Sequence, residues 1–184
     1  QVQWLAVGLI NVTLAALWMP WQRKVYGLVA RLFDSKQRLA DGAVAASLIA
    51  DVDPDDLITK GKQRLRRVPA KHITHELLMS NKSSVAEARQ LSEPCQVGDI
   101  DFFISHSWSD PPEAKFQVLE QVRKSFEKEH GRAPYFWLDK LCVDQTSEDT
   151  IKDDLQCLPV FLMACNQMLV VAGETYPQRL WCAW

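Results

Sequence analysis

The sequence predicts an α/β fold, in which a flavodoxin-like three-layer parallel sheet follows a mainly helical N-terminal region. Two observations predict the sheet. From Gly98 onward, short apolar runs typical of buried strands alternate with segments of helical periodicity. Polar and aromatic residues directly follow these runs, as they do where the strands of an open α/β sheet end at a binding site. A third observation, the helical spacing of apolar residues over residues 25–90, predicts the helical region.

The composition limits the classes of partner. The net charge of the 184 residues is −2, but residues 22–90 contain 13 Lys and Arg against 8 Asp and Glu, whereas residues 91–184 contain 8 against 15. An acidic C-terminal part argues against nucleic acid as a partner, because phosphate binding needs clustered cations. The 5 cysteines include no CxxC pair, so a reducing, intracellular setting is favoured. We expect no metal site, since His72, His75 and Cys95 are too few ligands for closed zinc coordination.

Residues 1–21 are expected to form a transmembrane or membrane-associated helix. Residues 2–19 carry no charge, and a spanning helix needs about 20 mostly apolar residues. Tryptophans lie near both ends of this segment, as in the aromatic belts of membrane proteins. Arg23 and Lys24 follow, which places the rest of the chain on the cytoplasmic side of the membrane. A buried core helix or an uncleaved signal-like segment is the alternative, because two central residues are polar.

Residues 22–97 are expected to be a helical, basic juxtamembrane region and linker. Asp53 followed by Pro54 predicts the start of a helix, which we expect to continue through the basic residues up to Arg67. A basic segment after a membrane span can lie against anionic lipid, and the alternative is an ordinary solvated helix face.

About three strands are expected in residues 98–184, namely Ile100–Ser105, Tyr135–Leu138 and Met168–Ala172. Between the first two strands, apolar residues three or four apart predict a helix that ends at Gly131. After the second strand, a helical stretch is expected to start near Ile151 and to be interrupted by Pro159.

Each expected strand is followed by residues that could bind a ligand. These residues are Ser105, His106, Ser107 and Trp108 after the first strand, Asp139, Lys140, Cys142, Asp144 and Gln145 after the second, and Glu174, Thr175 and Tyr176 after the third. Parallel neighbouring strands would gather them at one edge of the sheet. Hydroxyls, an imidazole, carboxylates and aromatic rings together suit a ligand with a sugar, a phosphate and a base.

Three of these segments resemble motifs of the TIR (Toll/interleukin-1 receptor) family. The run from Asp101 to Asp110 resembles the family's first-strand box, and Phe136-Trp-Leu-Asp139 resembles its second strand, which leads into the BB loop. Leu180-Trp-Cys-Ala-Trp184 resembles the start of its third helix, whose pattern is Trp-Cys-x-x-Glu. The sequences of these segments are similar to those of TIR-like domains of protists and oomycetes. They also have a distant similarity to the heterokaryon-incompatibility domain. We therefore expect residues 98–184 to be a truncated TIR-like domain.

The resemblance implies two activities. Many TIR domains associate with one another through the BB loop, here residues 139–148, so the first expectation is a membrane-tethered signalling and assembly module that binds other TIR-like domains. Others cleave NAD between nicotinamide and ribose, using the Glu of the Trp-Cys-x-x-Glu pattern. That Glu would follow Trp184, so we expect no catalytic residue, and no activity, in these 184 residues. A fold relic with neither activity is the third alternative.

If NAD binds, it is expected as a substrate, and no cofactor is required. The residues expected to line its cleft are Ser105, His106, Trp108, Trp137, Asp139, Lys140 and Trp181. Several have an alternative, purely structural interpretation: His106 bonded to backbone, Trp108 and Trp137 buried beside the sheet, Asp139 capping a turn and Trp181 anchoring the third helix.

Overall fold

The computed structural model describes residues 34–47, 52–79 and 89–178. Residues 38–184 form one compact unit. Of the other unit, residues 1–37, only residues 34–37 are described, and they are helical. The fold and the site below belong to the larger unit.

A five-stranded sheet forms the centre of this unit, with the strand order β2-β1-β4-β3-β5. The strand β3 (Ile100–His106) runs parallel to β4 (Tyr135–Trp137), the middle strand, on one side and to β5 (Cys165–Val171) on the other. Next to β4 lies β1 (Arg66–Pro69), which is antiparallel to it, and β2 (Glu93–Pro94) is antiparallel to β1. The sheet is therefore mostly parallel, and the predicted α/β class is confirmed.

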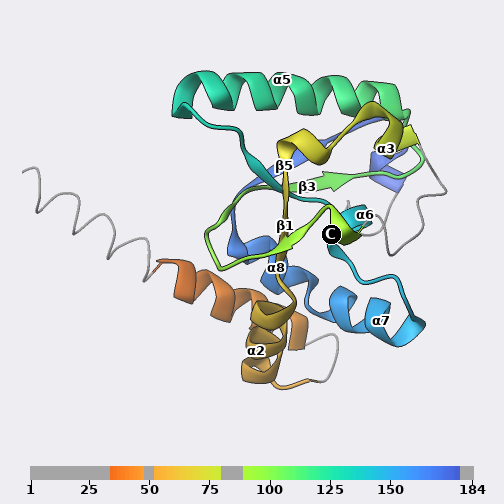
Figure 1. Ribbon diagram of the computed structural model, residues 1–184. Helices are drawn as coiled ribbons and strands as arrows, with labels where there is room; N and C mark the ends of the chain where they lie inside the picture. The colour runs from red at the N-terminus through yellow and green to blue at the C-terminus, as the bar shows by residue number, and fades with distance from the viewer. Residues whose placement is uncertain (1–33, 48–51, 80–88, 179–184) are drawn as a thin grey trace, which may run out of the picture. The chain divides into compact units, whose positions relative to one another are not determined.

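Helices cover both faces of the sheet (Figure 1). The helix α5 (Pro112–His130) joins β3 to β4 on one face. The segment from β4 to β5 contains α6 (Asp139–Cys142), α7 (Glu148–Gln156) and α8 (Leu158–Ala164), and α7 and α8 lie with α2 (Pro54–Arg64) on the other face. The strands β3, β4 and β5 thus take the spatial order second, first, third, which is how a flavodoxin-like sheet begins.

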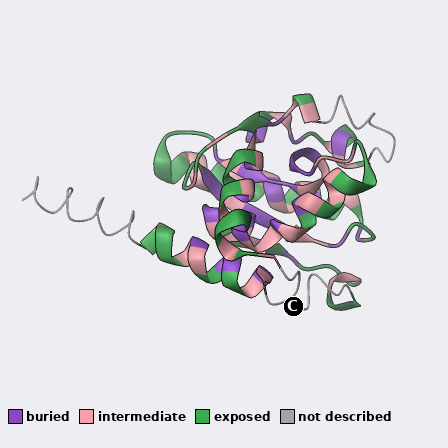
Figure 2. Ribbon diagram, turned by 90° about the horizontal axis from the view of Figure 1, so that it is seen from below, coloured by how far each residue is buried: buried purple, intermediate pink, exposed green. Residues whose placement is uncertain are grey.

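The core lies between the sheet and these helices. Alternate residues of β3 face opposite layers: Phe102 contacts Phe126 of α5 edge to face, and Phe103 stacks on Trp137 of β4 with ring centroids 4.5 Å apart. Trp137 in turn contacts Phe161 of α8. Figure 2 shows the buried residues concentrated in the strands and on the inner sides of the helices. This alternation is the period-two pattern that the apolar run around Phe103 predicts.

The helix α2 begins where the sequence predicts but ends earlier. The side chain of Asp53 caps it, accepting a hydrogen bond of 2.8 Å from the backbone N–H of Asp55. The helix ends at Arg64 instead of continuing through Arg67. The chain is extended from Leu65 onward and forms β1, and Pro69 at the end of this strand keeps Val68 out of the helical region.

Two strands, β1 and β2, lie within residues 22–97, which we expected to be helix and linker. Arg67 of β1 forms an ion pair of 2.8 Å with Glu93 of β2, and the backbone N–H of Cys95 donates to Leu65 O at 3.2 Å. Because β1 pairs with β4, the sheet extends across the boundary that we expected at residue 98.

The last crossover matches the expected break in its helical stretch but differs at β5. The stretch is interrupted next to Pro159: α7 ends at Gln156, and α8 begins at Leu158 with Pro159 in its first turn, where the missing N–H costs nothing. The strand β5 begins at Cys165, three residues before the expected start.

The expected membrane segment, residues 2–19, lies outside the described residues. Among the residues that the structure does describe, no helix is both long enough and apolar enough to cross a bilayer.

Candidate functional site

Polar side chains gather where β3, β4 and the loop after β5 meet. We call this group the strand-end cluster; its members are Ser105, His106, Ser107, Trp108, Asp110, Lys115, Asp139, Thr175 and Tyr176. They come together because β4 and β5 flank β3 in parallel, so all three strands end at the same edge of the sheet.

The carboxylate of Asp139 lies at the centre of one half of the cluster. Its Oδ1 lies 3.1 Å from His106 Nε2 and accepts a 2.7 Å hydrogen bond from the backbone N–H of Lys140, while its Oδ2 accepts one of 2.6 Å from Trp108 Nε1. Burial raises the pKa of Asp139, but the bonds from His106, Trp108 and Lys140 outweigh it and hold the pKa below its usual value. Asp139 is therefore ionised at neutral pH and fixes the ring of His106.

In the other half of the cluster, hydrogen bonds hold the loop after β5 against the end of β3. Ser105 Oγ and Tyr176 Oη are hydrogen-bonded at 2.8 Å, and Ser107 Oγ and Thr175 Oγ1 at 2.6 Å. Asp110 accepts hydrogen bonds from both the backbone N–H and the hydroxyl of Thr175, at 2.9 and 2.8 Å. These bonds from Thr175 lower the pKa of Asp110.

Gly173 allows this closure. An ideal Cβ at position 173 would lie 2.3 Å from Cγ of Asp110, a separation that no side chain tolerates. The loop can approach the carboxylate only because residue 173 has no side chain.

Lys115 is a buried cation beneath the cluster. It lies in the first turn of α5 and its Nζ donates to Ser107 O at 3.0 Å and to Trp108 O at 3.4 Å. Burial lowers the pKa of Lys115, and the nearby carboxylates of Asp110 and Asp139 act in the opposite direction. The ammonium thus holds the turn after β3 in place and balances the two carboxylates.

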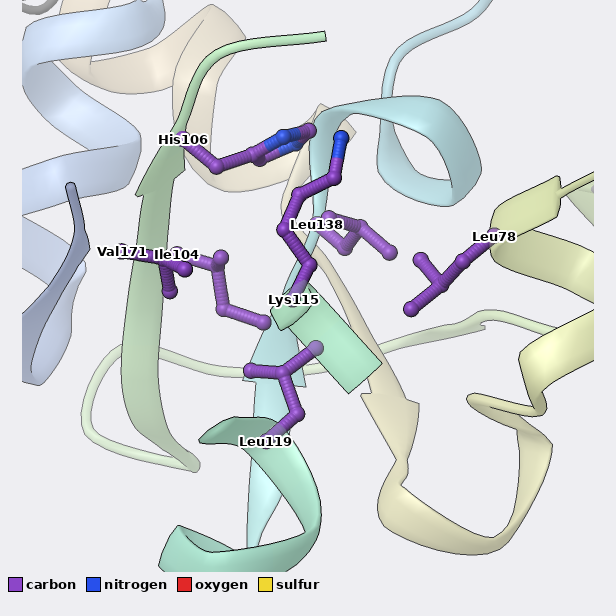
Figure 3. A pocket seen from close by; sticks show the side chains of 7 residues that line it. All are labelled: Leu78, Ile104, His106, Lys115, Leu119, Leu138 and Val171. Carbon is purple, nitrogen blue, oxygen red and sulfur yellow. The ribbon is translucent and has the colours of Figure 1, made fainter. Parts of the chain in front are cut away.

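A small cavity lies between Lys115 and His106 on one side and aliphatic side chains on the other (Figure 3). Its volume is about 10 Å³, which is room for a single water molecule. The side chains that line it are Leu78, Ile104, His106, Lys115, Leu119, Leu138 and Val171. Within the described residues, the polar side chains of the cluster are bonded to one another, and this cavity beside His106 and Lys115 is small.

The residues expected to line an NAD cleft divide into three groups. Ser105, His106, Trp108 and Asp139 lie together in the cluster. Trp137 is 1% exposed and packed between Phe103 and Phe161, so it serves the core. The amino group of Lys140 donates to Leu77 O of α3 (His75–Met79), and Trp181 lies outside the described residues.

Asp110 and Lys115 belong to the cluster but were not among the site residues expected from the sequence. Asp110 follows the expected strand end by several residues, and its partner Thr175 is distant in the chain. The position of Lys115 could have been recognised from the sequence. It precedes Leu119 by four residues, so it is a charged residue on the apolar face of the predicted helix.

The expected BB loop, residues 139–148, is anchored for most of its length. Leu141, Cys142 and Val143 are buried, and Leu141 O accepts a hydrogen bond from Ser92 Oγ at 2.8 Å. The backbone N–H of Asp144 donates to Asp154 at 2.6 Å. Within this loop only residues 146–148 are exposed.

Comparison of the chain with protein-family models, with curated proteins and with solved structures found no match. Across residues 34–47, 52–79 and 89–178, no group of three or more His, Cys, Asp or Glu side chains is arranged to hold a metal ion. The function is therefore inferred from the chain's own geometry.

A second feature with functional meaning is β5, the last strand of the described sheet. Met168 is 54% exposed and Val170 is 41% exposed, although both belong to a strand of the central sheet. The sequence from Leu158 to Gly173, which contains β5, has no charged residue. Within the described residues, β5 therefore exposes apolar side chains at Met168 and Val170 beside the polar Asn166 and Gln167.

Proposed function

We propose that the chain is an assembly module whose α/β unit associates with a second copy of itself. The observation that carries this proposal is the exposure of two apolar side chains of β5, Met168 and Val170, in the part of the chain that the structure describes. Removing apolar area from water is the main favourable term in protein association. The association of TIR domains, which residues 98–184 resemble, adds support.

The strand β5 also lacks the features that usually protect an outer strand. Folded monomers protect their outer strands with charges, proline or bulges, and β5 has neither charge nor proline. A second copy could therefore approach this strand without charge repulsion, although residues 91–184 as a whole are acidic.

Cleavage of NAD is the second candidate. The ionised Asp139, held beside His106 and the hydroxyls at the strand ends, supports it. The hydrogen bonds at the strand ends act against it, because they tie the loop after β5 to the turn after β3. The bonds of Asp110 to Thr175 would have to open before a nucleotide could enter.

We also propose that residues 2–19 hold this module at a membrane. The support is their lack of charge, the tryptophans near their ends and the basic pair Arg23 and Lys24 that follows. The α/β unit would then be on the cytoplasmic side.

Self-association is tested on the whole chain in a mild detergent, so that residues 2–19 do not aggregate. Sedimentation equilibrium over a wide concentration range should show a mass that rises from one to two chains. A single chain at every concentration would contradict the proposal. Nicotinamide release from NAD tests the second candidate, and it is measured on a chain extended past Trp184, because the Glu that the resemblance implies would follow that residue.

A further inference from the structure

We infer that a groove between α3 and α5 binds a free aromatic α-amino acid. The groove has a volume of about 400 Å³, within the range of about 300–1,000 Å³ that is usual for small-molecule sites. Its walls are α5 and residues 70–75, which contain the short helix η1 (Ala70–His72) and the start of α3. It shares no residue with the strand-end cluster, so this site is separate from both functions proposed above.

One face of α5 forms the first wall. The residues of α5 that line the groove are spaced three or four apart and therefore lie in one row along the helix. They are Phe116, Glu120, Arg123 and Glu127. Figure 1 shows α3 beside this helix. The groove therefore runs along α5, with residues 70–75 as its second wall.

Part of the lining is apolar. Ala70 and Ile73 are buried, and Phe116 is half-buried. The ring of His75 packs edge to face with that of Phe116, with ring centroids 5.7 Å apart, so the position of Phe116 is fixed. Aromatic rings pair favourably with one another, so this surface suits the ring of a ligand.

The α5 wall carries an excess of negative charge. The guanidinium of Arg123 donates to both carboxylate oxygens of Glu120 and to both of Glu127, at 2.8–2.9 Å. The hydrogen bond from Arg123 lowers the pKa of Glu120, which is therefore ionised at neutral pH. Two carboxylates thus share one cation, and their oxygens can accept further hydrogen bonds. Such a wall suits an ammonium group.

The second wall carries hydrogen-bond donors. Lys71 is exposed, and within the part of the chain that the structure describes its ammonium has no partner. Thr74 Oγ1 accepts a hydrogen bond of 3.2 Å from the backbone N–H of Leu77, which leaves the hydroxyl hydrogen of Thr74 available. An ammonium and a hydroxyl donor together suit a carboxylate. His75, the remaining titratable residue of the lining, is paired with Glu113.

The two walls together define the ligand. One has an excess negative charge and the other an excess positive charge, so a molecule with one ammonium and one carboxylate satisfies both. Its aromatic ring contacts the apolar part of the lining. Lys71 and Thr74 are exposed, so the ligand enters without breaking the hydrogen bonds of the fold.

Three matched ligands test the inference. L-Phenylalanine carries both charges, 3-phenylpropanoate lacks the ammonium, and 2-phenylethylamine lacks the carboxylate. NMR titration of each ligand with the whole chain in a mild detergent measures its dissociation constant, and detergent alone gives the blank. We expect phenylalanine to bind at least about fivefold more tightly than either analogue, because each analogue lacks one charged hydrogen-bonding group.

Two substitutions locate the charges. We expect Lys71→Met to weaken the binding of phenylalanine and 3-phenylpropanoate at least about fivefold and to leave that of 2-phenylethylamine unchanged. Glu127→Gln should weaken the binding of phenylalanine and 2-phenylethylamine and leave that of 3-phenylpropanoate unchanged. The controls Lys62→Met on α2 and Glu129→Gln on α5, both exposed and outside the groove, should bind all three ligands like wild type.

The opposite selectivity of the two variants is the decisive result, because a general loss of structure would weaken all three ligands alike. A wild-type chain that does not bind phenylalanine at millimolar concentrations overturns the inference. Equal binding of phenylalanine to wild type and Lys71→Met overturns it too. Neither result depends on self-association, which sedimentation tests separately.

Discussion

The residues at the strand ends form a network that depends on contacts between distant parts of the sequence. His106 and Asp139 were predicted to lie together, because each directly follows a predicted strand. The partnership of Asp110 with Thr175 was not predictable, since it depends on the exact path of two loops. Nothing in the sequence around Gly173 indicates that this residue permits the contact. Only the nearby carboxylate of Asp110 explains why a glycine is needed there.

The network makes the stability of the protein depend on pH through Asp110. Its pKa lies below the ordinary value of 3.8, so the ionised group stabilises the fold above that pH, and the contribution disappears as the pH falls through the lowered pKa. We expect Asp110→Asn to lower the urea midpoint of unfolding at pH 7, with the difference from wild type shrinking below about pH 4.

The control for this experiment is Glu129→Gln, an exposed position on the same helix α5. It should leave the urea midpoint close to that of wild type throughout the titration. A deficit of Asp110→Asn that is the same at pH 7 and at pH 3 would show that the charge is not what matters.

At the scale of elements, α2 and α8 pack closely because α2 carries a glycine at the contact. An ideal Cβ on Gly61 would lie 2.7 Å from Cγ1 of Val160, whose side chain is itself buried. A glycine inside a helix is ordinarily unfavourable, so its presence here is explained by the close approach.

A double-mutant cycle measures this contact. We expect Gly61→Ala to destabilise the protein by about 1–3 kcal/mol through overpacking, although alanine favours the helix. In the background of Val160→Ala the same change should cost nothing or stabilise, because the added methyl group fills space that the valine left. Chemical unfolding of the four proteins should give a coupling of about 1 kcal/mol or more, and additive effects would contradict the contact.

Some strands were predictable from the sequence and others were not. The strands β3, β4 and β5 were predicted, because each is an apolar run bounded by polar residues. The strand β1 was missed since its four residues begin with Arg66 and Arg67, which look like the end of a basic helix. The two residues of β2 are too few to form a pattern, and only the pairing with β1 identifies them.

The whole molecule combines a folded α/β unit with the N-terminal segment expected to bind a membrane. The fold class was predictable because it depends on periodicity, which is a property of the sequence itself. The hydrogen bonds within the strand-end cluster could not be predicted, because they depend on the distances between Lys115, Asp110 and the loop after β5.

Vesicle flotation tests the membrane segment. The whole chain should float with neutral phospholipid vesicles, and Ile10→Lys, in the middle of residues 2–19, should reduce the bound fraction strongly. A lysine at the centre of a membrane helix costs about 2.5–3.5 kcal/mol, which corresponds to a loss on the order of 100-fold. The control Gln121→Lys, at an exposed position on α5, should float like wild type, and equal flotation of all three would refute the segment's role.

The position of β3 between β4 and β5 has a consequence for how the protein is made. Its partners lie far along the chain, because Phe102 pairs with Phe136 and Ile100 pairs with Cys165. During synthesis, the apolar β3 therefore leaves the ribosome before both of the strands that flank it. The nascent chain must keep this apolar segment away from other nascent chains until β5 has been made.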